Sequence, residues 1–263
     1  MSTLELRDVT KTYRLRGGFR ARTLTAVAGA SFTIESGKTT ALVGQSGSGK
    51  STIAKLLMQL ERPSSGSILL DGRPVGRHGA ALRAYRSDVQ MVFQDPFASL
   101  NPYHSVRHHL ERPLLLHGKA TGREELDAKV TSLLERVRLD PDMAERRPHE
   151  LSGGQRQRIA IARALAPEPK ILVADEPVSM LDVSIRLGVL NLLADLQNEE
   201  DLGVLYITHD LATARHFSDE ILVMYRGELV ERGPADDVIL NPQHDYTRLL
   251  AEAAPNPEKR IRA

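Results

Sequence analysis

Cysteine is absent from this chain of 263 residues, so disulfide bonds, thiolate-bound metals and iron–sulfur clusters are excluded. Long apolar runs are missing too, since no uncharged stretch approaches the roughly 18 residues that a membrane-spanning helix needs. The formal net charge is only +1, so there is no overall electrostatic field that would favour binding to nucleic acid or to an anionic membrane. Charged residues in Met1–Arg7 also argue against a signal peptide. We therefore expect a soluble protein whose membrane role, if any, comes through a partner.

A phosphate-binding loop is the clearest positive signal. Gly44–Thr52 satisfies the pattern G-x-x-x-x-G-K-[ST], between a short buried strand (Thr39–Val43) and a segment with helical spacing. Glycines let backbone N–H groups approach phosphates, and the helix N-terminus favours anions. Lys50 is expected to neutralise the terminal phosphates, and the Ser51 hydroxyl to hold Mg²⁺. The alternative is a glycine-rich turn that binds nothing. The predicted nucleotide-phosphate residues are Gly44, Ser46, Gly47, Gly49, Lys50, Ser51 and Thr52.

Beyond this loop, strands are expected on both sides of a helical segment. Val106–His117, Arg123–Arg138 and Gln155–Ala166 carry helical spacing without a convincing strand. The continuous apolar run Lys170–Asp175 is typical of a strand covered on both faces. These patterns predict a helical insertion, at about residues 95–165, between strands of a parallel sheet.

Two acidic residues, Asp175 and Glu176, end that apolar strand. In a phosphate-loop fold an aspartate at such a strand end can hold the same Mg²⁺ as Ser51. Glu176 would then polarise a water molecule aimed at the terminal phosphate. The alternative is an acidic pair that only caps the strand.

A second glycine-containing helix start follows the sequence Leu-Ser-Gly-Gly-Gln at residues 151–155. Ser152 is a suitable N-cap, and Gly153 and Gly154 expose backbone N–H groups, so this turn is a second potential phosphate site. One nucleotide loop and two phosphate sites in one chain suggest a head-to-tail dimer. Each nucleotide would then lie between the Lys50 loop of one subunit and the Ser152–Gln155 turn of the other.

This arrangement resembles the ATP-binding subunits of ABC transporters over roughly residues 3–250. The resemblance implies ATP and Mg²⁺ as ligands, and the ABC ATPase fold. That fold is α/β, a phosphate-loop NTPase core with a mainly parallel sheet, an antiparallel β subdomain and an inserted helical subdomain. We expect a single domain over residues 1–253 and a flexible basic tail over 254–263.

The same resemblance assigns further roles. Tyr13 resembles the aromatic that stacks on adenine, Gln94 the glutamine that joins the metal and attacking water, and His209 the histidine that contacts the terminal phosphate. Glu176 matches the catalytic glutamate. Ser179–Asp182 matches a segment that usually reads Ser-Ala-Leu-Asp, so Met180 departs from the pattern while Asp182 keeps it. Separately, each could be an ordinary strand-surface, loop or strand-end residue. Expected catalytic residues are Lys50, Gln94, Glu176 and His209; expected metal ligands are Ser51, Gln94 and Asp175; Tyr13, Ser152, Gly153, Gly154, Gln155 and Asp182 would contact ATP.

Within the family, Val89–Pro102 and His244–Leu250 are similar to the second ATPase subunit of importers of peptides and nickel. Asp245 departs from the usual His-Pro-Tyr-Thr, and the cysteine cluster of many peptide-type members is missing. The resemblance implies a paired homologous ATPase, two membrane-spanning permeases and an extracytoplasmic binding protein. It also implies a peripheral location on the cytoplasmic face of the plasma (inner) membrane. The missing cluster and the short tail favour the nickel or metallophore branch slightly, but whether peptides, nickel or a metal chelate are carried stays open.

Two other interpretations were weighed. A soluble ABC-type ATPase acting on nucleic acid or ribosomes would draw on the basic loop Arg14–Arg22, but such proteins usually carry two ATP-binding halves or a long coiled coil. His104, His108, His109 and His117 invite a nickel site, yet a solvated helical face is the simpler interpretation. We expect Phe97–His109 to dock a permease helix, with Phe97, Leu100 and Tyr103 as apolar anchors.

Overall fold

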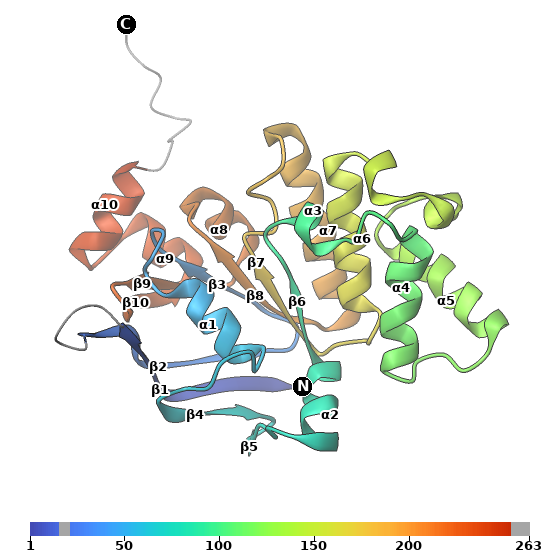
Figure 1. The fold of residues 1–263 in the computed structure, drawn as a ribbon. Coiled ribbons are helices and arrows are strands. Elements are labelled where there is room, and N and C mark those ends of the chain that lie inside the picture. The colour runs from blue at the N-terminus through green and yellow to red at the C-terminus, as the bar shows by residue number, and fades with distance from the viewer. Residues whose placement is uncertain (16–21, 254–263) are drawn as a thin grey trace, which may run out of the picture. The chain divides into compact units, whose positions relative to one another are not determined.

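The computed structural model describes residues 1–15 and 22–253 (Figure 1). It contains two compact units. The first unit consists of Met1–Leu4, Ile34–Lys38 and Leu69–Val204; the second consists of Glu5–Thr33, Thr39–Ile68 and Leu205–Ala263. The predicted flexible tail at 254–263 and most of the basic loop lie outside the described residues.

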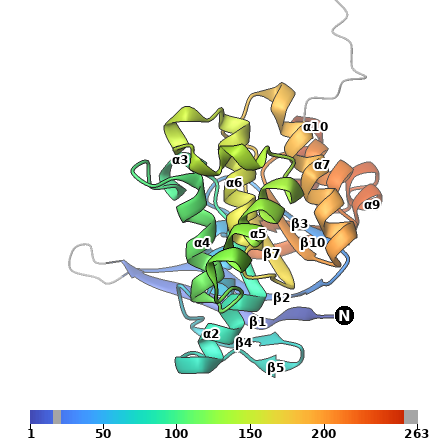
Figure 2. The same cartoon turned by 90° about the vertical axis from the view of Figure 1, so that its right-hand side faces the viewer.

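The first unit is rich in helices. They are α2 (Gly79–Asp88), α3 (Pro96–Ser99), α4 (Val106–Leu116), α5 (Arg123–Arg136), α6 (Gly153–Leu165) and α7 (Val183–Glu200), with 3₁₀ turns η1 (Pro141–Glu145) and η2 (Pro148–Glu150). Strands β6 (Val89–Val92) and β7 (Ile171–Asp175) pair in parallel, and the short β5 (Arg73–Pro74) pairs antiparallel with the end of β4 (Ser65–Leu70). Figure 2 shows α4, α5, α6 and α7 grouped together, and their contacts agree.

The second unit contains most of β1 (Thr3–Leu15), β2 (Arg22–Glu35) and β4 (Ser65–Leu70), which neighbour each other in the order β2-β1-β4. Its other strands follow the order β10-β9-β3-β8, and they are β3 (Thr39–Val43), β8 (Gly203–Thr208), β9 (Glu220–Tyr225) and β10 (Glu228–Pro234). Strand β3 is parallel to β9, which is antiparallel to β10. The helices of this unit are α1 (Lys50–Leu57), α8 (Leu211–Phe217), α9 (Ala235–Leu240) and α10 (Asp245–Ala253).

Burial explains where the sequence predicted elements correctly. All five residues of β3 are buried, as are four of the five in β7, which is why these strands read as continuous apolar runs. In α5 the buried residues Leu126, Val130, Leu133 and Leu134 recur at helical spacing. From Val106 to Arg163, a fully described stretch, the structure has helices and turns but no strand, as predicted.

Two helices were not predicted, for different reasons. Helix α2 buries only Tyr85, so it lacks the apolar stripe that marks a helix in the sequence. Helix α3 has only four residues, too few for a period to show; it begins because the Asp95 carboxylate accepts hydrogen bonds from the N–H groups of Phe97 and Ala98. Among the described residues, no helix combines the length and hydrophobicity needed to span a membrane.

Candidate functional site

The phosphate loop of the second unit lies between β3 and α1, and its shape requires glycine at two places. Gly44 has a φ of +155°, and a Cβ there would lie 2.2 Å from the Met224 carbonyl oxygen. Gly49 has a φ of +117°, and its Cβ would lie 2.4 Å from the Ala26 carbonyl oxygen. Any side chain would therefore combine a backbone conformation unsuited to L-residues with a steric clash. The two motif glycines fix how the loop leaves the strand and enters the helix.

Lys50 lies at the base of this loop and is only 5% exposed. Its Nζ donates hydrogen bonds to the carbonyl oxygens of Gly44, at 2.5 Å, and Gln45, at 3.0 Å. The loop tip, residues 45–47, is exposed. The loop thus holds a buried ammonium group with its own carbonyls and presents its tip to solvent.

The residues of the loop fit a phosphate ligand. The Ser48 hydroxyl is buried and has no hydrogen-bond partner among the described residues, so the loop contains a polar group with a bond left to make. Helix α1 starts at Lys50, and N–H groups at a helix start favour anions. Ser51 is exposed at this helix start, and Thr52 is half-buried.

The loop has supports that the sequence analysis missed. The Gly227 N–H donates to the Ser48 carbonyl oxygen at 2.8 Å, and the Gln45 N–H donates to the Tyr246 hydroxyl at 2.9 Å. Gly227 lies between β9 and β10, and Tyr246 lies in α10. Only the His244–Leu250 family match pointed to Tyr246, and no spacing in the sequence linked it to the loop.

Tyr13 and His209 also belong to the second unit. The Tyr13 hydroxyl donates to the Glu61 carboxylate at 2.5 Å, and the Lys11 Nζ lies 5.0 Å from the ring centroid. Burial and the bond to Glu61 raise the pKa of Tyr13, whereas the Thr52 side chain lowers it. Tyr13 thus reaches the helix that follows the loop. His209 is exposed after β8. Adenine stacking and phosphate contact by these residues stay predictions.

In the first unit, the structure brings Gln94 and Glu176 together. Strands β6 and β7 pair in parallel with Val92 opposite Ala174, and Gln94 and Glu176 each lie two positions beyond these partners. The Gln94 Nε2 donates to the Glu176 Oε2 at 3.0 Å. Glu176 has a φ of +46°, an uncommon conformation for a residue with a side chain and one found often at functional sites. Asp175 ends β7 immediately before it.

The turn Ser152–Gln155 starts α6 with a capping box. The Gln155 N–H donates to the Ser152 Oγ at 3.3 Å, and the Ser152 N–H donates to the Gln155 Oε1 at 2.9 Å. A Cβ on Gly154 would lie 2.7 Å from the Ile185 Cγ2, whereas one on Gly153 would meet nothing closer than the Leu181 Cδ2 at 3.5 Å. Gly154 therefore lets α6 approach α7 closely.

The segment that leads into α7 is open to solvent. Asp182 occupies the N-cap position of α7 without a side-chain capping bond, and it is exposed. Met180, which departs from the family pattern, is 58% exposed. Its extra bulk therefore does not disturb the core of this unit.

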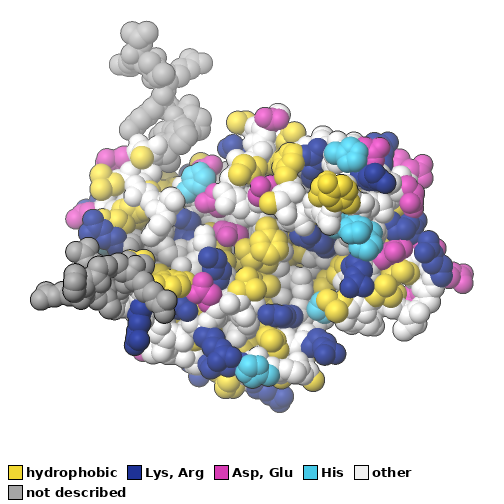
Figure 3. All heavy atoms as spheres, in the orientation of Figure 1, with side chains coloured by type: hydrophobic (Ala, Val, Ile, Leu, Met, Phe, Trp, Pro, Cys, Tyr) yellow, Lys and Arg dark blue, Asp and Glu magenta, His cyan; other side chains and the backbone are white. Residues whose placement is uncertain are grey.

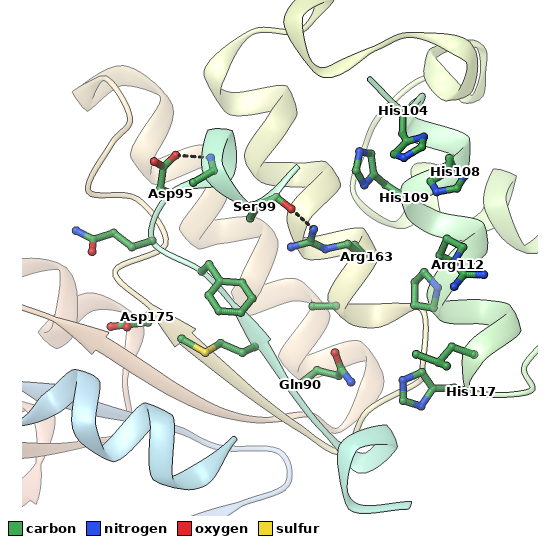
Figure 4. A pocket seen from close by; sticks show the side chains of 17 residues that line it. Gln90, Asp95, Ser99, His104, His108, His109, Arg112, His117, Arg163 and Asp175 are labelled. Carbon is green, nitrogen blue, oxygen red and sulfur yellow. Dashed lines mark hydrogen bonds between the residues drawn. The ribbon is translucent and has the colours of Figure 1, made fainter. Parts of the chain in front are cut away.

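A pocket of about 870 Å³ opens in the first unit beside β6, α3 and α4 (Figure 4). Asp175 and Gln94 are among its lining residues, and Figure 4 shows Asp175 on one side of the view and His104, His108 and His109 together on the other. The rings of His104 and His108 stack with centroids 4.0 Å apart. Arg163 reaches into the same region and donates to the Ser99 carbonyl oxygen at 2.5 Å.

Two expectations about this region are corrected. The histidines were interpreted as a solvated helical face, but His109 is only 8% exposed, and burial lowers its pKa. Leu100 was expected to be an exposed anchor, but it is 1% exposed because it packs in the core. Among the described residues no group of three or more His, Cys, Asp or Glu side chains is placed to hold a metal ion.

Phe97 and Tyr103 are exposed, at 55% and 83%. Phe97 has the Arg156 guanidinium over its ring at 4.1 Å, whereas no such contact is found for Tyr103 among the described residues. Figure 3 shows hydrophobic and histidine side chains close together on the surface over α3 and α4.

Comparisons with known proteins agree with this geometry. The family model "ABC transporter" matches residues 27–179. The chain is 49% identical to the di/tripeptide transport ATP-binding protein DppF of Pseudomonas aeruginosa, over 97% of this chain and 79% of that protein. It is 45% identical to the oligopeptide transport ATP-binding protein AppF of Bacillus subtilis, over 98% and 79%.

Among solved structures, the ATP-binding cassette MJ0796, a dimer in a post-hydrolysis state with ADP and Pi, superimposes with a TM-score of 0.77 at 31% identity, covering 88% of this chain and 98% of that one. The predicted resemblance and fold class are therefore confirmed, whereas the roles of individual site residues and the single-domain boundaries stay predictions. The chain belongs to the ABC transporter family as an ATP-binding subunit.

Proposed function

We propose that this chain uses ATP hydrolysis, the reaction of its family, to energise the import of short peptides. One observation carries the choice of substrate class: 49% identity over 97% of the chain to a di/tripeptide transport ATP-binding protein. The AppF relative, an oligopeptide transport protein, supports the same class.

For hydrolysis, the first unit offers a carboxylate and an amide already in contact. We assign Glu176 to orient the attacking water, because a carboxylate at that place accepts a proton from the nucleophile as it attacks. Gln94 donates a hydrogen bond to Glu176 and so holds that carboxylate in place. In the second unit, Lys50 balances the charge of the terminal phosphate, in bound ATP and in the transition state alike, and His209 contacts the same group.

Ser51, Gln94 and Asp175 are the residues that would hold Mg²⁺. Hydroxyl, amide and carboxylate oxygens are the ligands that this hard cation prefers. Bound there, the ion would supply charge neutralisation between the phosphates. Tyr13 would stack on the adenine.

In this proposal, a homologous subunit placed head to tail completes the nucleotide-binding site. Ser152–Gln155 and Asp182 of that subunit would contact the ATP held by the phosphate loop of this one. The exposure of Ser152 and Asp182 and the dimeric state of the MJ0796 cassette support this arrangement. The isolated chain should then hydrolyse ATP slowly, and undiminished turnover by a strictly monomeric sample would contradict it.

Partners in the membrane would convert dimer closure into transport. We propose two permease subunits, an extracytoplasmic binding protein and a peripheral location on the cytoplasmic face of the membrane. The pocket beside α3 and α4, with exposed Phe97 and Tyr103 nearby, is the surface we assign to a permease helix.

Uptake of labelled di- and tripeptides tests the proposal directly. The gene that encodes the chain is deleted from its host and reintroduced as wild type or as Glu176→Gln. Peptide uptake is then measured, and membrane proteins bound to the chain are identified by pull-down. Restoration by the wild type only, with co-purified permeases, supports peptide import. Uptake of Ni²⁺ or a metal chelate instead of peptides would overturn the substrate class, and recovery of nucleic acid or ribosomes without permeases would favour the soluble ATPase.

A further inference from the structure

A single peptide group of the phosphate loop is held from both of its edges. The Gly44 carbonyl oxygen accepts the hydrogen bond from the Lys50 Nζ at 2.5 Å, and the N–H of the same peptide group, on Gln45, donates to the Tyr246 hydroxyl at 2.9 Å. A peptide group is planar, with its C=O and N–H pointing in opposite directions. A tilt of the plane at the Tyr246 edge must therefore move the carbonyl that holds Lys50.

Tyr246 itself is held firmly in the second unit. The side chain is 6% exposed, and its ring stacks on Tyr225 with centroids 4.1 Å apart and planes 28° from parallel. Its backbone N–H donates to the Nδ1 of His244 at 3.1 Å. The ring is thus held by its stack on Tyr225 and the backbone by the bond to His244, so the hydroxyl is delivered to one place, which is what a positioning residue requires.

The turn before α10 is anchored as well. The two carboxylate oxygens of Glu231, on β10, accept the N–H groups of Gln243 at 2.7 Å and His244 at 2.9 Å. A bidentate carboxylate that accepts two backbone N–H groups fixes both the position and the direction of a turn. A continuous set of contacts thus runs from β10 through the turn and Tyr246 to the loop.

We propose that Tyr246 is a positioning residue for ATP binding: its hydroxyl orients the Gly44–Gln45 peptide group so that Lys50 stands where the phosphates enter. This inference rests on the proposed role of Lys50 and extends it to the C-terminal helix α10. Nothing in the phosphate-loop pattern itself calls for this hydroxyl, since the pattern lies entirely within Gly44–Ser51.

The variant Tyr246→Phe isolates the hydroxyl. It keeps the ring and its stack on Tyr225 but leaves the Gln45 N–H without its acceptor. The loss of one such bond predicts a rise in the Kd for Mg-ATP of about three- to tenfold. We expect KM to rise in parallel while kcat changes by less than about twofold, because Lys50 positioning affects the bound ground state and the transition state alike.

Tyr225→Phe is the matched control. It removes a phenol hydroxyl from the other ring of the same stack, and within the described residues that hydroxyl makes no hydrogen bond. Its Kd should stay within about twofold of the wild type. Amide hydrogen exchange at Gln45, measured on the full chain without nucleotide, should be slow in the wild type and in Tyr225→Phe and fast in Tyr246→Phe.

Lys50→Ala separates failure of this inference from failure of the proposed site. If Lys50→Ala binds ATP as tightly as the wild type, the phosphate-site assignment is wrong. If it loses binding while Tyr246→Phe keeps a Kd within twofold of Tyr225→Phe, the positioning role is overturned and the proposed function stands. Equal exchange of the Gln45 amide in both tyrosine variants would likewise overturn it, as would a fall in kcat and melting temperature without a change in Kd.

Discussion

Two glycine-containing helix starts in this protein are held in place by different means. At the phosphate loop, the N-cap Gly49 makes no side-chain capping bond, and the loop depends on contacts from Met224, Gly227 and Tyr246. At the Ser152–Gln155 turn, two side chains of the turn cap its own backbone. The first start is supported by segments distant in the chain, with Gln45 and Tyr246 separated by 201 positions. The second is supported within four residues.

The difference indicates what each site must tolerate. A turn that caps itself keeps its shape while its surroundings change, which suits a surface that a partner subunit would approach and leave. A loop held by segments distant in the chain stays pre-organised around a buried lysine. Substitutions should therefore act through long-range contacts at the loop and locally at the turn.

The largest effect on turnover is expected from a substitution that lies outside both helix starts. Glu176→Gln keeps the size of the side chain but removes the carboxylate that would orient water. Turnover should fall by about 100- to 10,000-fold while Kd for ATP stays near the wild-type value. Steady-state phosphate release and equilibrium ATP binding measure the two quantities. Retention of most activity would refute the assigned role of Glu176.

A methyl group placed at each start gives the sharpest comparison. At Gly44 it would meet the Met224 carbonyl oxygen at 2.2 Å, with φ at +155°, so Gly44→Ala should weaken ATP binding by about 100-fold or more. At Gly153 the contact would be an ordinary 3.5 Å. Gly153→Ala should therefore fold normally and bind ATP as the isolated wild-type chain does. Similar losses in the two variants, by titration calorimetry, would contradict the contrast.

A moderate effect is expected from removing the local cap. Ser152→Ala loses the acceptor for the Gln155 N–H, which should cost about 0.5–2 kcal/mol. For a chain of this size each kcal/mol corresponds to a fall in melting temperature of about 2–4 °C. The control is Ser46→Ala, at an exposed loop residue whose hydroxyl makes no hydrogen bond within the described residues. Calorimetry should show a smaller change for the control, and an equal change would remove the local-cap argument.

The smallest expected effect is a loss of stability at acid pH. Burial tends to raise the pKa of Glu231, but the N–H groups of Gln243 and His244, together with the Thr247 side chain and the charge of His244, outweigh it, and the pKa lies below its ordinary value of 4.5. The folded state then binds fewer protons than the unfolded state, so this stabilisation is full above pH 4.5 and is lost as pH falls through the folded pKa. The capping box of the other turn contains no ionisable side chain and should not titrate.

Melting temperatures of the wild type and Glu231→Gln measure this acid dependence. Their difference should be constant near neutral pH and shrink below pH 4.5. Ser152→Ala serves as the control, since its difference from the wild type should not follow pH in this range. A melting-temperature difference between the wild type and Glu231→Gln that widens as the pH falls would contradict the lowered pKa of Glu231.

Much of the architecture could be predicted because its signals are local. Buried strands such as Thr39–Val43 read as continuous apolar runs, and α5 shows its apolar stripe. Helix α2 was missed because it buries only Tyr85. Leu100 was wrongly predicted to be exposed. It lies near exposed aromatic residues, and the sequence does not distinguish an apolar docking residue from an apolar core residue at such a position.

The sequence by itself determined the two helix starts, the acidic strand end and the family, because each is written in the order of neighbouring residues. Only the tertiary structure decided that Gln94 meets Glu176, which lies 82 positions away, and that Tyr246 meets Gln45. Those contacts depend on the register of β6 against β7 and on where β10 anchors α10. Residue spacing encodes conformation over a few residues, whereas contacts between distant segments arise from packing, which no local pattern specifies.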